Sequence, residues 1–324
     1  MTGPKTVLAV LCDERARPPG MRRIETVAEV RYTDAADLPT AVHGADALFV
    51  WDFTSTAVAD AWPRADRLRW IHIASAGVDR LLFPELADSP VVLTNSRGIF
   101  DRPIAEYFLG LILAIAKDLA TTMVLQQQGT WRHRETLRID TQHALVVGTG
   151  SIGRATGRLL RAAGLSVAGL GRTARSADPD FGVVHAGGEL PALLPDADYV
   201  VVAAPLTDAT RGMFDAAAFA RMKDSAWLIN VGRGPIVNEG DMVRALAAGD
   251  LGGAALDVFD EEPLPTGSPL WTMPNVVVSP HMSGDFVGWH AALVALFGEN
   301  LDRWLAGEPL RNEVDKGAGY VRSA

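Results

Sequence analysis

A glycine-rich loop in the middle of the chain constrains the possible folds more than any other feature. Residues Gly148–Gly153 (GTGSIG) follow the apolar run Ala144–Val147 and precede the helical pattern Arg154–Ala163. With this spacing, the first glycine permits a tight turn, the second lets backbone amides reach a pyrophosphate, and the third lets helix and strand pack closely. The amino end of the helix then faces the negative charge. A purely structural turn is the alternative, but strand, spacing and helix together favour dinucleotide binding.

Short apolar runs rich in β-branched residues alternate with helical or polar segments on both sides of this loop. They are Thr6–Leu11, Val27–Tyr32, Ala47–Trp51, Trp70–Ala74 and Val91–Asn95 before it, and Ser166–Leu170, Tyr199–Ala203, Ala226–Val231, Gly253–Val258 and Asn275–Ser279 after it. Such alternation predicts parallel sheets that bind ligands outside the carboxyl ends of their strands. Because 324 residues exceed one ordinary domain, we expect an α/β fold of two doubly wound parallel-sheet domains, Rossmann-like or flavodoxin-like.

Two further segments predict helices that link or close these domains. Asp101 can cap a helix and Pro103 suits its first turn, so the apolar pattern from Ile104 to about Leu125 predicts one long connecting helix. The segment Asp285–Leu305 predicts a last helix that returns to pack on the first unit.

Composition and charge argue against several classes of function. A net charge of −9 disfavours nucleic-acid surfaces, which need clustered Lys and Arg, and disfavours anionic membranes. The longest apolar run, Phe108–Ala116, is too short to span a bilayer, and Met1–Gly20 lacks the basic start and long apolar centre of a signal peptide. Cys12 is the only cysteine, and the seven histidines show no zinc-site spacing. We expect a cytoplasmic enzyme without a metal.

The end of the strand after the glycine-rich loop bears on the choice of cofactor. Ser166–Leu170 runs into Gly171-Arg172-Thr173, where an NAD enzyme usually places an Asp or Glu that holds the ribose hydroxyls. An arginine can instead bind the 2′-phosphate of NADP, so Arg172 favours NADP(H) over NAD(H), with Arg175 as a second candidate. A solvated surface arginine is the alternative.

Three polar residues, Arg233, Glu262 and His281, follow three successive strands near the end of the second strand set. Reduction of a ketone by hydride needs a proton donor, and histidine titrates near neutral pH. A carboxylate beside it orients the imidazole and favours its charged form, whereas a guanidinium can clamp a substrate carboxylate. Each residue alone has a structural explanation. Together, downstream of a dinucleotide loop, they predict hydride transfer to and from a small 2-oxo or 2-hydroxy acid.

Nearly the whole chain resembles the D-isomer-specific 2-hydroxyacid dehydrogenase family. The motifs that carry the resemblance stand in family order: Gly148–Gly153, Asn230–Gly234, Leu256–Pro263 and Ser279-Pro280-His281. The resemblance implies that Arg233, Glu262 and His281 form the catalytic trio. It selects Glu262, the acid before the proline, over its rivals Asp260 and Glu261.

The resemblance also implies roles for residues that the pattern alone does not single out. With Arg172, the residues expected at the cofactor are Gly148, Gly150, Ser151, Ile152, Gly153, Ala204, Pro205, Val231, Gly232 and Asp257. Ser151 and Ile152 would touch the pyrophosphate, and Asp257 would accept from the nicotinamide carboxamide. The residues expected at the substrate are Arg233, His281 and the backbone of Ala76, Gly77 and Val78.

The split architecture of the family implies the domain organisation. Residues 1–97 and 285–324 would form a substrate-binding domain, residues 98–284 would form the inserted dinucleotide-binding domain, and the active site would lie in the cleft between them. Family members commonly dimerise through the connecting helix and the following arm, here Ala105–Trp131, so we expect a homodimer. Packing within one chain is the alternative role of this apolar helix.

Two questions stay open at the level of sequence. Glyoxylate or hydroxypyruvate is the first expected substrate, because Arg172 suggests NADPH and NADPH commonly drives reduction; a bulkier 2-oxo acid is the alternative. A corepressor of the carboxyl-terminal-binding type shares the fold and binds a dinucleotide and partner peptides, but the extended disordered tail of such proteins is missing here. Resemblance to formate dehydrogenase would require Gln in place of Glu262.

Overall fold

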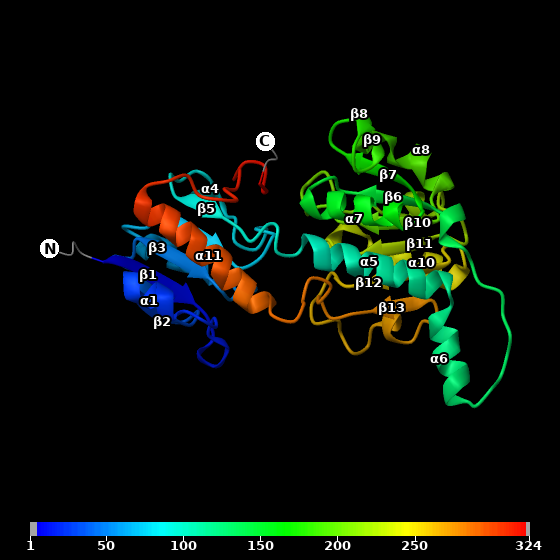
Figure 1. The fold of residues 1–324 in the computed structure, drawn as a ribbon, viewed down its shortest axis with the longest axis horizontal. Coiled ribbons are helices and arrows are strands. Elements are labelled where there is room, and N and C mark those ends of the chain that lie inside the picture. Colours follow the sequence, from blue (N-terminus) through cyan, green and yellow to red (C-terminus); the bar gives the residue numbers. More distant parts are fainter. Residues whose placement is uncertain (1–4, 322–324) are drawn as a thin grey trace. The chain divides into compact units, whose positions relative to one another are not determined.

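The computed structural model describes residues 5–321, and the chain divides into two units (Figure 1). Unit 1 is Met1–Phe100 with Phe286–Ala324, and unit 2 is Asp101–Asp285. The crossings expected near Arg97 and Asp285 lie close to these boundaries. The expected domain bounds also include residues 1–4 and 322–324, which lie outside the described residues.

The sheet of unit 1 has a flavodoxin-like strand order. Its parallel strands are arranged β2-β1-β3-β4-β5. Their bounds are Thr6–Leu11 (β1), Ala28–Thr33 (β2), Ala47–Val50 (β3), Trp70–Ile73 (β4) and Val92–Thr94 (β5). Because the strand order reverses beside β1, the loops after β1, β3 and β4 leave the edge of the sheet where such folds bind ligands.

Both faces of this sheet are buried, as expected for a parallel sheet. The helices of unit 1 are Arg22–Val27 (α1), Leu38–Val42 (α2), Ala57–Ala61 (α3), Pro84–Ala87 (α4) and Trp289–Ala306 (α11). Leu8 and Val10 of β1 join a core with Phe297 of α11, whereas Ala9 and Leu11 join the core of the opposite face. The final helix therefore returns to unit 1 as predicted. It begins at Trp289, after Gly288 at φ 97°, and not at Asp285.

The sheet of unit 2 is Rossmann-like and has the order β13-β12-β11-β10-β6-β7-β9-β8. Its strands are His143–Val147 (β6), Ser166–Gly171 (β7), Arg175–Asp178 (β8), Gly182–Ala186 (β9), Tyr199–Val202 (β10), Trp227–Asn230 (β11), Gly253–Leu256 (β12) and Val276–Val278 (β13). All neighbours are parallel except β8 and β9. The order reverses between β6 and β10, which places the glycine-rich loop at the switch point.

Helices flank this second sheet as well. They are Asp101–Ala116 (α5), Leu119–Gln127 (α6), Ser151–Ala162 (α7), Leu190–Leu193 (α8), Ala216–Phe219 (α9) and Glu239–Ala248 (α10). Helix α5 packs on α7, while Leu190, Phe219 and Met242 from α8, α9 and α10 share one core with the sheet.

The expected single helix from Ile104 to about Leu125 is wrong, because the structure has two helices there. Helix α5 ends at Ala116, α6 begins at Leu119, and the two are bent by 62°. Between them Asp118 adopts φ 47°, a left-handed conformation that a helix cannot contain, and its carboxylate binds Arg134 at 2.8 Å. Among residues 5–321 no single helix is long and apolar enough to cross a membrane; α5 and α6 pass that test only as this bent pair.

Candidate active site

The glycine-rich loop forms a tight turn between β6 and α7. Gly148 has φ 105°, and a Cβ on it would lie 2.7 Å from the backbone of Ala203. A Cβ on Gly153 would lie 1.9 Å from the oxygen of Gly148, so helix and loop can touch only without a side chain there. A Cβ on Gly150 would meet open space, and Gly150, the N-cap residue of α7, has no side chain that could bond the first amides of the helix. The amino end of a helix of this kind favours an anion.

Two neighbouring loops bring the other expected cofactor residues to this turn. Ala204 and Pro205 follow β10, whereas Val231 and Gly232 follow β11, its neighbour in the sheet. A Cβ on Gly232 would lie 2.8 Å from the oxygen of Ala204, so the two loops are in contact. These residues thus line the same edge of the sheet as the glycine-rich loop.

The first turn of α7 is also tied to α5. The hydroxyl of Ser151 donates to Asp101 at 3.0 Å, and the carbonyl of Ile152 accepts from Thr156 within the helix at 2.9 Å. The expected contact of Ser151 and Ile152 with a pyrophosphate stays a prediction.

One of the two residues expected near a 2′-phosphate lies at the carboxyl end of β7. Arg172 directly follows this strand and is exposed, and Arg175 begins β8. Nη2 of Arg175 is buried and has no hydrogen-bond acceptor among the described residues. The carboxylate that NAD enzymes usually place at the end of this strand is missing, and Arg172 stands there instead, while Arg175 lies on the edge strand β8 with β9 between it and β7.

The predicted catalytic trio lies at the carboxyl ends of three adjacent strands. Arg233 follows β11, Glu262 follows β12 and His281 follows β13, and these strands are neighbours in one sheet (Figure 1). The carboxyl ends of parallel strands share one edge, so the three loops leave the sheet on the same side as the glycine-rich loop.

Within the trio, His281 and Glu262 form a direct pair. Nδ1 of His281 lies 3.0 Å from Oε2 of Glu262, and Oε1 of the same carboxylate accepts from the backbone of Phe259 at 3.1 Å. The two side chains are 45% and 21% exposed, so the imidazole is accessible while the acid is half-buried. An imidazole whose Nδ1 faces a carboxylate presents Nε2 to the opposite side. Glu262, and not Asp260 or Glu261, makes this contact.

The turn that carries Arg233 is shaped by Asn230. The Asn230 side chain is 1% exposed, accepts from the amide of Gly232 at 3.0 Å and donates to the carbonyl of Arg233 at 3.0 Å. A Cβ on Gly234 would lie 2.0 Å from the backbone of Phe259, which presses the turn against the segment that carries Glu262. The backbone of Arg233 is therefore held by Asn230 on one side and by the contact of Gly234 with Phe259 on the other.

A buried carboxylate, Asp257, holds the turn that carries His281. It is 1% exposed and accepts from the hydroxyl of Ser279 at 2.6 Å and from the amides of Met282 and Ser283 at 2.9 Å each. These contacts bracket His281, which adopts φ 52°. The expected role of Asp257 at the nicotinamide carboxamide stays a prediction.

The sequence analysis gave no supporting role to Asn230 and Ser279, although both belong to the quoted motifs, and it did not single out Tyr107. Tyr107 lies on α5, where burial raises the pKa of its hydroxyl and a hydrogen bond with Ser279 opposes that shift. The position of Asn230 and Ser279 as polar residues at the ends of apolar strands was the sequence feature that could have indicated their supporting role. Nothing in the sequence connects Tyr107 with a strand end so far along the chain.

The loop expected at the substrate carboxylate lies in unit 1, after β4. Its carbonyls are held by side chains, with the Ser75 hydroxyl bound to Gly77 at 2.6 Å and the Asn95 amide bound to Ala76 at 2.6 Å. Val78 is 2% exposed and anchors the loop in the core. The binding of a substrate carboxylate by Ala76, Gly77 and Val78 stays a prediction.

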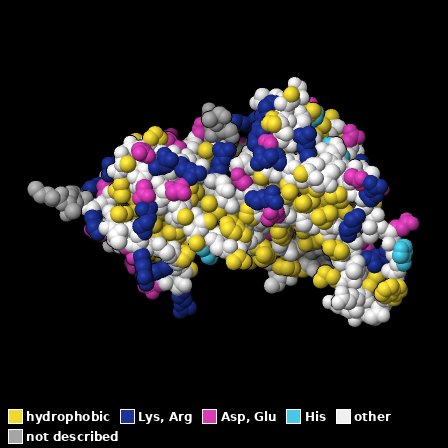
Figure 2. Space-filling model, viewed as in Figure 1, with side chains coloured by type: hydrophobic (Ala, Val, Ile, Leu, Met, Phe, Trp, Pro, Cys, Tyr) yellow, Lys and Arg dark blue, Asp and Glu magenta, His cyan; other side chains and the backbone are white. Residues whose placement is uncertain are grey.

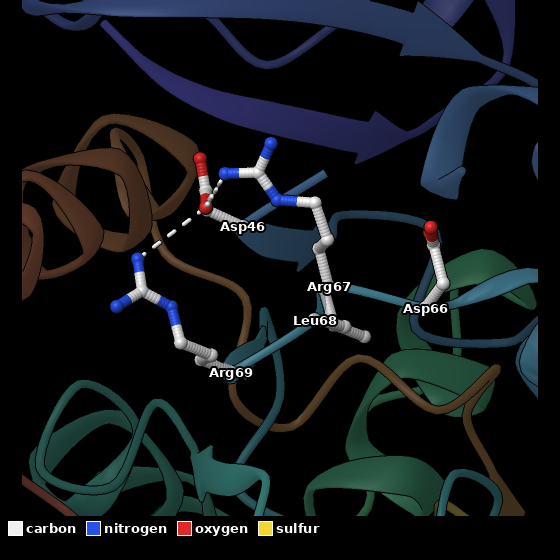
Figure 3. A pocket seen from close by; sticks show the side chains of 5 residues that line it. All are labelled: Asp46, Asp66, Arg67, Leu68 and Arg69. Carbon is white, nitrogen blue, oxygen red and sulfur yellow. Dashed lines mark hydrogen bonds and ion pairs between the residues drawn. The ribbon is translucent and has the colours of Figure 1, made fainter. Parts of the chain in front are cut away.

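A hollow of about 460 Å³ lies elsewhere in unit 1 (Figure 3). Its lining consists of Asp46, Asp66, Arg67, Leu68 and Arg69. Arg67 and Arg69 both reach Asp46, at 3.1 and 3.3 Å, and Asp46 also accepts from the backbone of Val7 at 2.9 Å. These residues precede β3 and β4, at the edge opposite to the one where such sheets bind ligands. We therefore assign the ion pairs that line this hollow a structural role.

Comparison with known protein families shows to which family the chain belongs. The model of the D-isomer specific 2-hydroxyacid dehydrogenase NAD binding domain matches residues 109–283, which is more than half of the 324-residue chain. The chain belongs to the D-isomer specific 2-hydroxyacid dehydrogenase family. The matched range contains all the residues expected at the cofactor and the whole predicted catalytic trio, whereas Ala76, Gly77 and Val78 lie outside it.

Individual members of the 2-hydroxyacid dehydrogenase family are similar over most of the chain. A glyoxylate/hydroxypyruvate reductase B from Salmonella newport is 33% identical over 256 residues, covering 76% of this chain and 78% of its own length. A D-isomer specific 2-hydroxyacid dehydrogenase family protein from Aeromonas salmonicida has a solved structure with a TM-score of 0.82, 31% identity, and coverage of 97% and 100% of the two chains.

A third relative was solved with a cofactor. The NADPH-dependent glyoxylate/hydroxypyruvate reductase from Sinorhizobium meliloti, in complex with NADP and sulfate, has a TM-score of 0.82, 30% identity and coverage of 98% and 100%. Together, the family and its members support an NAD(P)-dependent oxidoreductase that acts on small 2-oxo or 2-hydroxy acids.

Proposed function

We propose that this enzyme reduces glyoxylate or hydroxypyruvate with NADPH. The observation that carries the proposal is the 3.0 Å contact between His281 and Glu262 at the sheet edge that also bears Arg233 and the glycine-rich loop. The names of the relatives from Salmonella newport and Sinorhizobium meliloti support this choice of substrate.

In this proposal His281 carries the proton. Glu262 holds Nδ1 of the imidazole, so that Nε2–H can donate to the carbonyl oxygen of a 2-oxo acid as it becomes a hydroxyl group. In the reverse direction the hydroxyl returns its proton to Nε2. The guanidinium of Arg233 matches the substrate carboxylate in a fork geometry and polarises the adjacent carbonyl.

The residues of this site fit a nicotinamide dinucleotide phosphate. Gly148, Gly150 and the amino end of α7 would hold the pyrophosphate, while Arg172 and the unused Nη2 of Arg175 would hold the 2′-phosphate. When bound, the reduced nicotinamide supplies the hydride that the carbonyl carbon accepts.

A kinetic screen tests this proposal. Initial rates of NADPH and NADH oxidation are measured with glyoxylate, hydroxypyruvate, pyruvate, phenylpyruvate and 2-oxoisocaproate. We expect the highest kcat/KM with NADPH and one of the first two acids. Arg172→Ala should lower kcat/KM for NADPH more than for NADH, whereas Arg221→Ala, an exposed arginine after α9, should leave the ratio unchanged. Absence of turnover with every acid and both cofactors would reject the enzymatic activity.

We also propose that two copies of the chain associate through α5, α6 and the arm of residues 128–138. Large apolar side chains are exposed there: Leu113, Leu119, Met123, Val124, Trp131 and Leu137. Figure 2 shows hydrophobic side chains gathered along α5. Contiguous exposed apolar surface of this kind marks an interaction site.

A further inference from the structure

A group of charged residues joins the helix after the glycine-rich loop to the β8–β9 hairpin. We call it the Asp178 cluster, and its members are Arg154, Arg158, Arg175, Asp178 and Asp180. Two of the arginines lie on α7, and Arg175 and Asp178 begin and end β8. Figure 2 shows Lys and Arg side chains gathered at this end of unit 2.

Asp178 connects the two parts of the cluster. Its side chain is 2% exposed and binds Nη2 of Arg154 at 3.2 Å and Nε of Arg175 at 2.9 Å. Asp180 binds Arg154 at 2.7 Å and Arg158 at 2.9 Å. Burial raises the pKa of both carboxyls, but hydrogen bonds from the arginines, together with one from the backbone in the case of Asp178, outweigh burial, and each pKa lies below its usual range. Both carboxylates are therefore ionised at neutral pH.

The cluster carries an excess of positive charge. Three guanidinium groups face two carboxylates, which leaves one net positive charge, and Arg172 adds another close along the chain. In addition, Nη2 of Arg175 is buried without an acceptor among residues 5–321. A buried N–H group without an acceptor is unfavourable, so Arg175 has hydrogen-bonding capacity that the chain itself does not use. A phosphate dianion would balance the excess positive charge and accept a hydrogen bond from Nη2 of Arg175.

The hairpin that carries Asp178 is fixed to the framework of the dinucleotide domain. Phe181, in the turn of the hairpin, is 1% exposed. Its ring lies so close to Gly157 of α7 and Gly169 of β7 that a Cβ would come within 2.7 and 2.9 Å of it. The Asp178 carboxylate is thus held on a rigid support next to the helix that begins at the glycine-rich loop.

We propose that Asp178 is a positioning residue for the cofactor: it holds the guanidinium of Arg175 so that Arg175 selects the 2′-phosphate of NADP(H), without Asp178 itself touching the dinucleotide. This inference rests on the proposed use of NADPH. A guanidinium held on one edge loses less conformational entropy when its other edge binds a phosphate.

Coulomb attraction alone predicts the opposite result, which makes the proposal testable. Removal of the Asp178 charge makes the cluster more positive and would by itself strengthen the binding of a phosphate. Loss of the Asp178 carboxylate that holds Arg175 would instead weaken the binding of the phosphate. We expect the loss of positioning to dominate, because the phosphate must meet the arginine in a defined geometry.

The test measures the binding of two cofactor fragments to the full chain by calorimetry. Adenosine 2′,5′-bisphosphate carries the 2′-phosphate and 5′-AMP does not. In the unaltered protein we expect the bisphosphate to bind more tightly than 5′-AMP. Asp178→Asn should reduce this preference about tenfold, with unchanged affinity for 5′-AMP. Asp180→Asn is the matched control, since Asp180 is a buried acid of the same cluster that binds Arg154 and Arg158.

Arg175→Lys gives a second, milder variant that keeps the charge and removes the Nε contact. It should lower the preference as Asp178→Asn does, and Asp178→Asn should add nothing in an Arg175→Ala background. An equal preference in Asp178→Asn and Asp180→Asn, or tighter bisphosphate binding in Asp178→Asn, would overturn the inference. An unaltered protein that binds both fragments equally would instead reject the proposed use of NADPH. Should Asp178→Asn fail to fold, an unchanged preference in Arg175→Lys would overturn the inference by itself.

Discussion

At the scale of single residues, the contact between His281 and Glu262 leads to a prediction about catalysis. His281→Ala removes the group that would donate the proton, and a positioned general acid or base contributes about 10²–10⁴-fold to a rate. We therefore expect kcat to fall by roughly that factor, while the dissociation constant of the dinucleotide changes little. Stopped-flow measurement of hydride transfer and fluorescence titration of the dinucleotide separate the two effects.

The neighbouring acids supply the controls for this prediction. Glu262→Gln should also lower kcat, because Glu262 holds Nδ1 of the imidazole at 3.0 Å. Glu261→Gln changes an exposed acid next to it and should leave kcat unchanged. Equal loss of turnover and dinucleotide binding in His281→Ala would show that His281 has a structural role only.

A second histidine predicts how the stability of the protein depends on pH. His72 is fully buried in unit 1, with Nδ1 2.7 Å from the Thr94 hydroxyl, and burial lowers its pKa to about 3. In the unfolded chain the ring regains its ordinary pKa of about 6.5. Between these values only the unfolded chain binds the proton, so the free energy of unfolding is highest above pH 6.5 and falls as the pH drops towards 3, by roughly 1 kcal/mol per pH unit.

Urea unfolding at pH 7.5 and 5.0 tests this dependence. His72→Gln cannot titrate and can still bond Thr94, so the difference in unfolding free energy between the two pH values should shrink by roughly 2 kcal/mol. His43→Gln, at an exposed histidine of the same unit, should retain the full difference. An identical difference in the unaltered protein and His72→Gln would show that other groups cause the pH dependence.

At the scale of elements, regular strands were predictable and irregular connections were not. The strand Thr6–Leu11 has the predicted bounds, because its apolar residues are buried on both faces of the sheet. The hairpin of β8 and β9 was missed, since Arg175–Asp178 is polar and pairs across a register shift. The break between α5 and α6 was missed because the apolar pattern continues across Asp118, and only its φ of 47° interrupts the helix.

The same contrast holds within the candidate site. The strand-end trio and the glycine-rich loop could be predicted, because parallel strands bring consecutive loops to one edge. The residues that hold these loops depend on tertiary contacts between distant segments, such as Asp257 with Met282 and Ser283. Short-range sequence patterns do not encode such contacts. The motif therefore predicts where the chemistry lies, and the structure adds what keeps it in place.

At the scale of the whole molecule, the exposed apolar surface of unit 2 predicts association. The Met123 residue is 63% exposed and Trp131 is fully exposed, on α6 and on the arm that follows it. The arm is held close to the helices, since Leu137 donates to Ala116 at 2.9 Å and Arg134 binds Asp118 at 2.8 Å. This surface is therefore shaped before any partner binds, and a second copy of the chain would cover it through a twofold contact.

In a twofold dimer both subunits contribute the same residue to the interface, so one substitution removes two side chains from it. Burial of a large apolar side chain contributes roughly 1.5–3 kcal/mol, so Met123→Glu should weaken dimerisation by about 3–6 kcal/mol, or about 10²–10⁴-fold in Kd. Light scattering coupled to size-exclusion chromatography at several concentrations measures this shift towards the monomer. Val287→Ser, which removes an even more exposed aliphatic side chain from unit 1, should leave the dimer intact. A monomeric unaltered protein at all concentrations, or a stable dimer of Met123→Glu, would assign the apolar surface of α6 to another partner or to none.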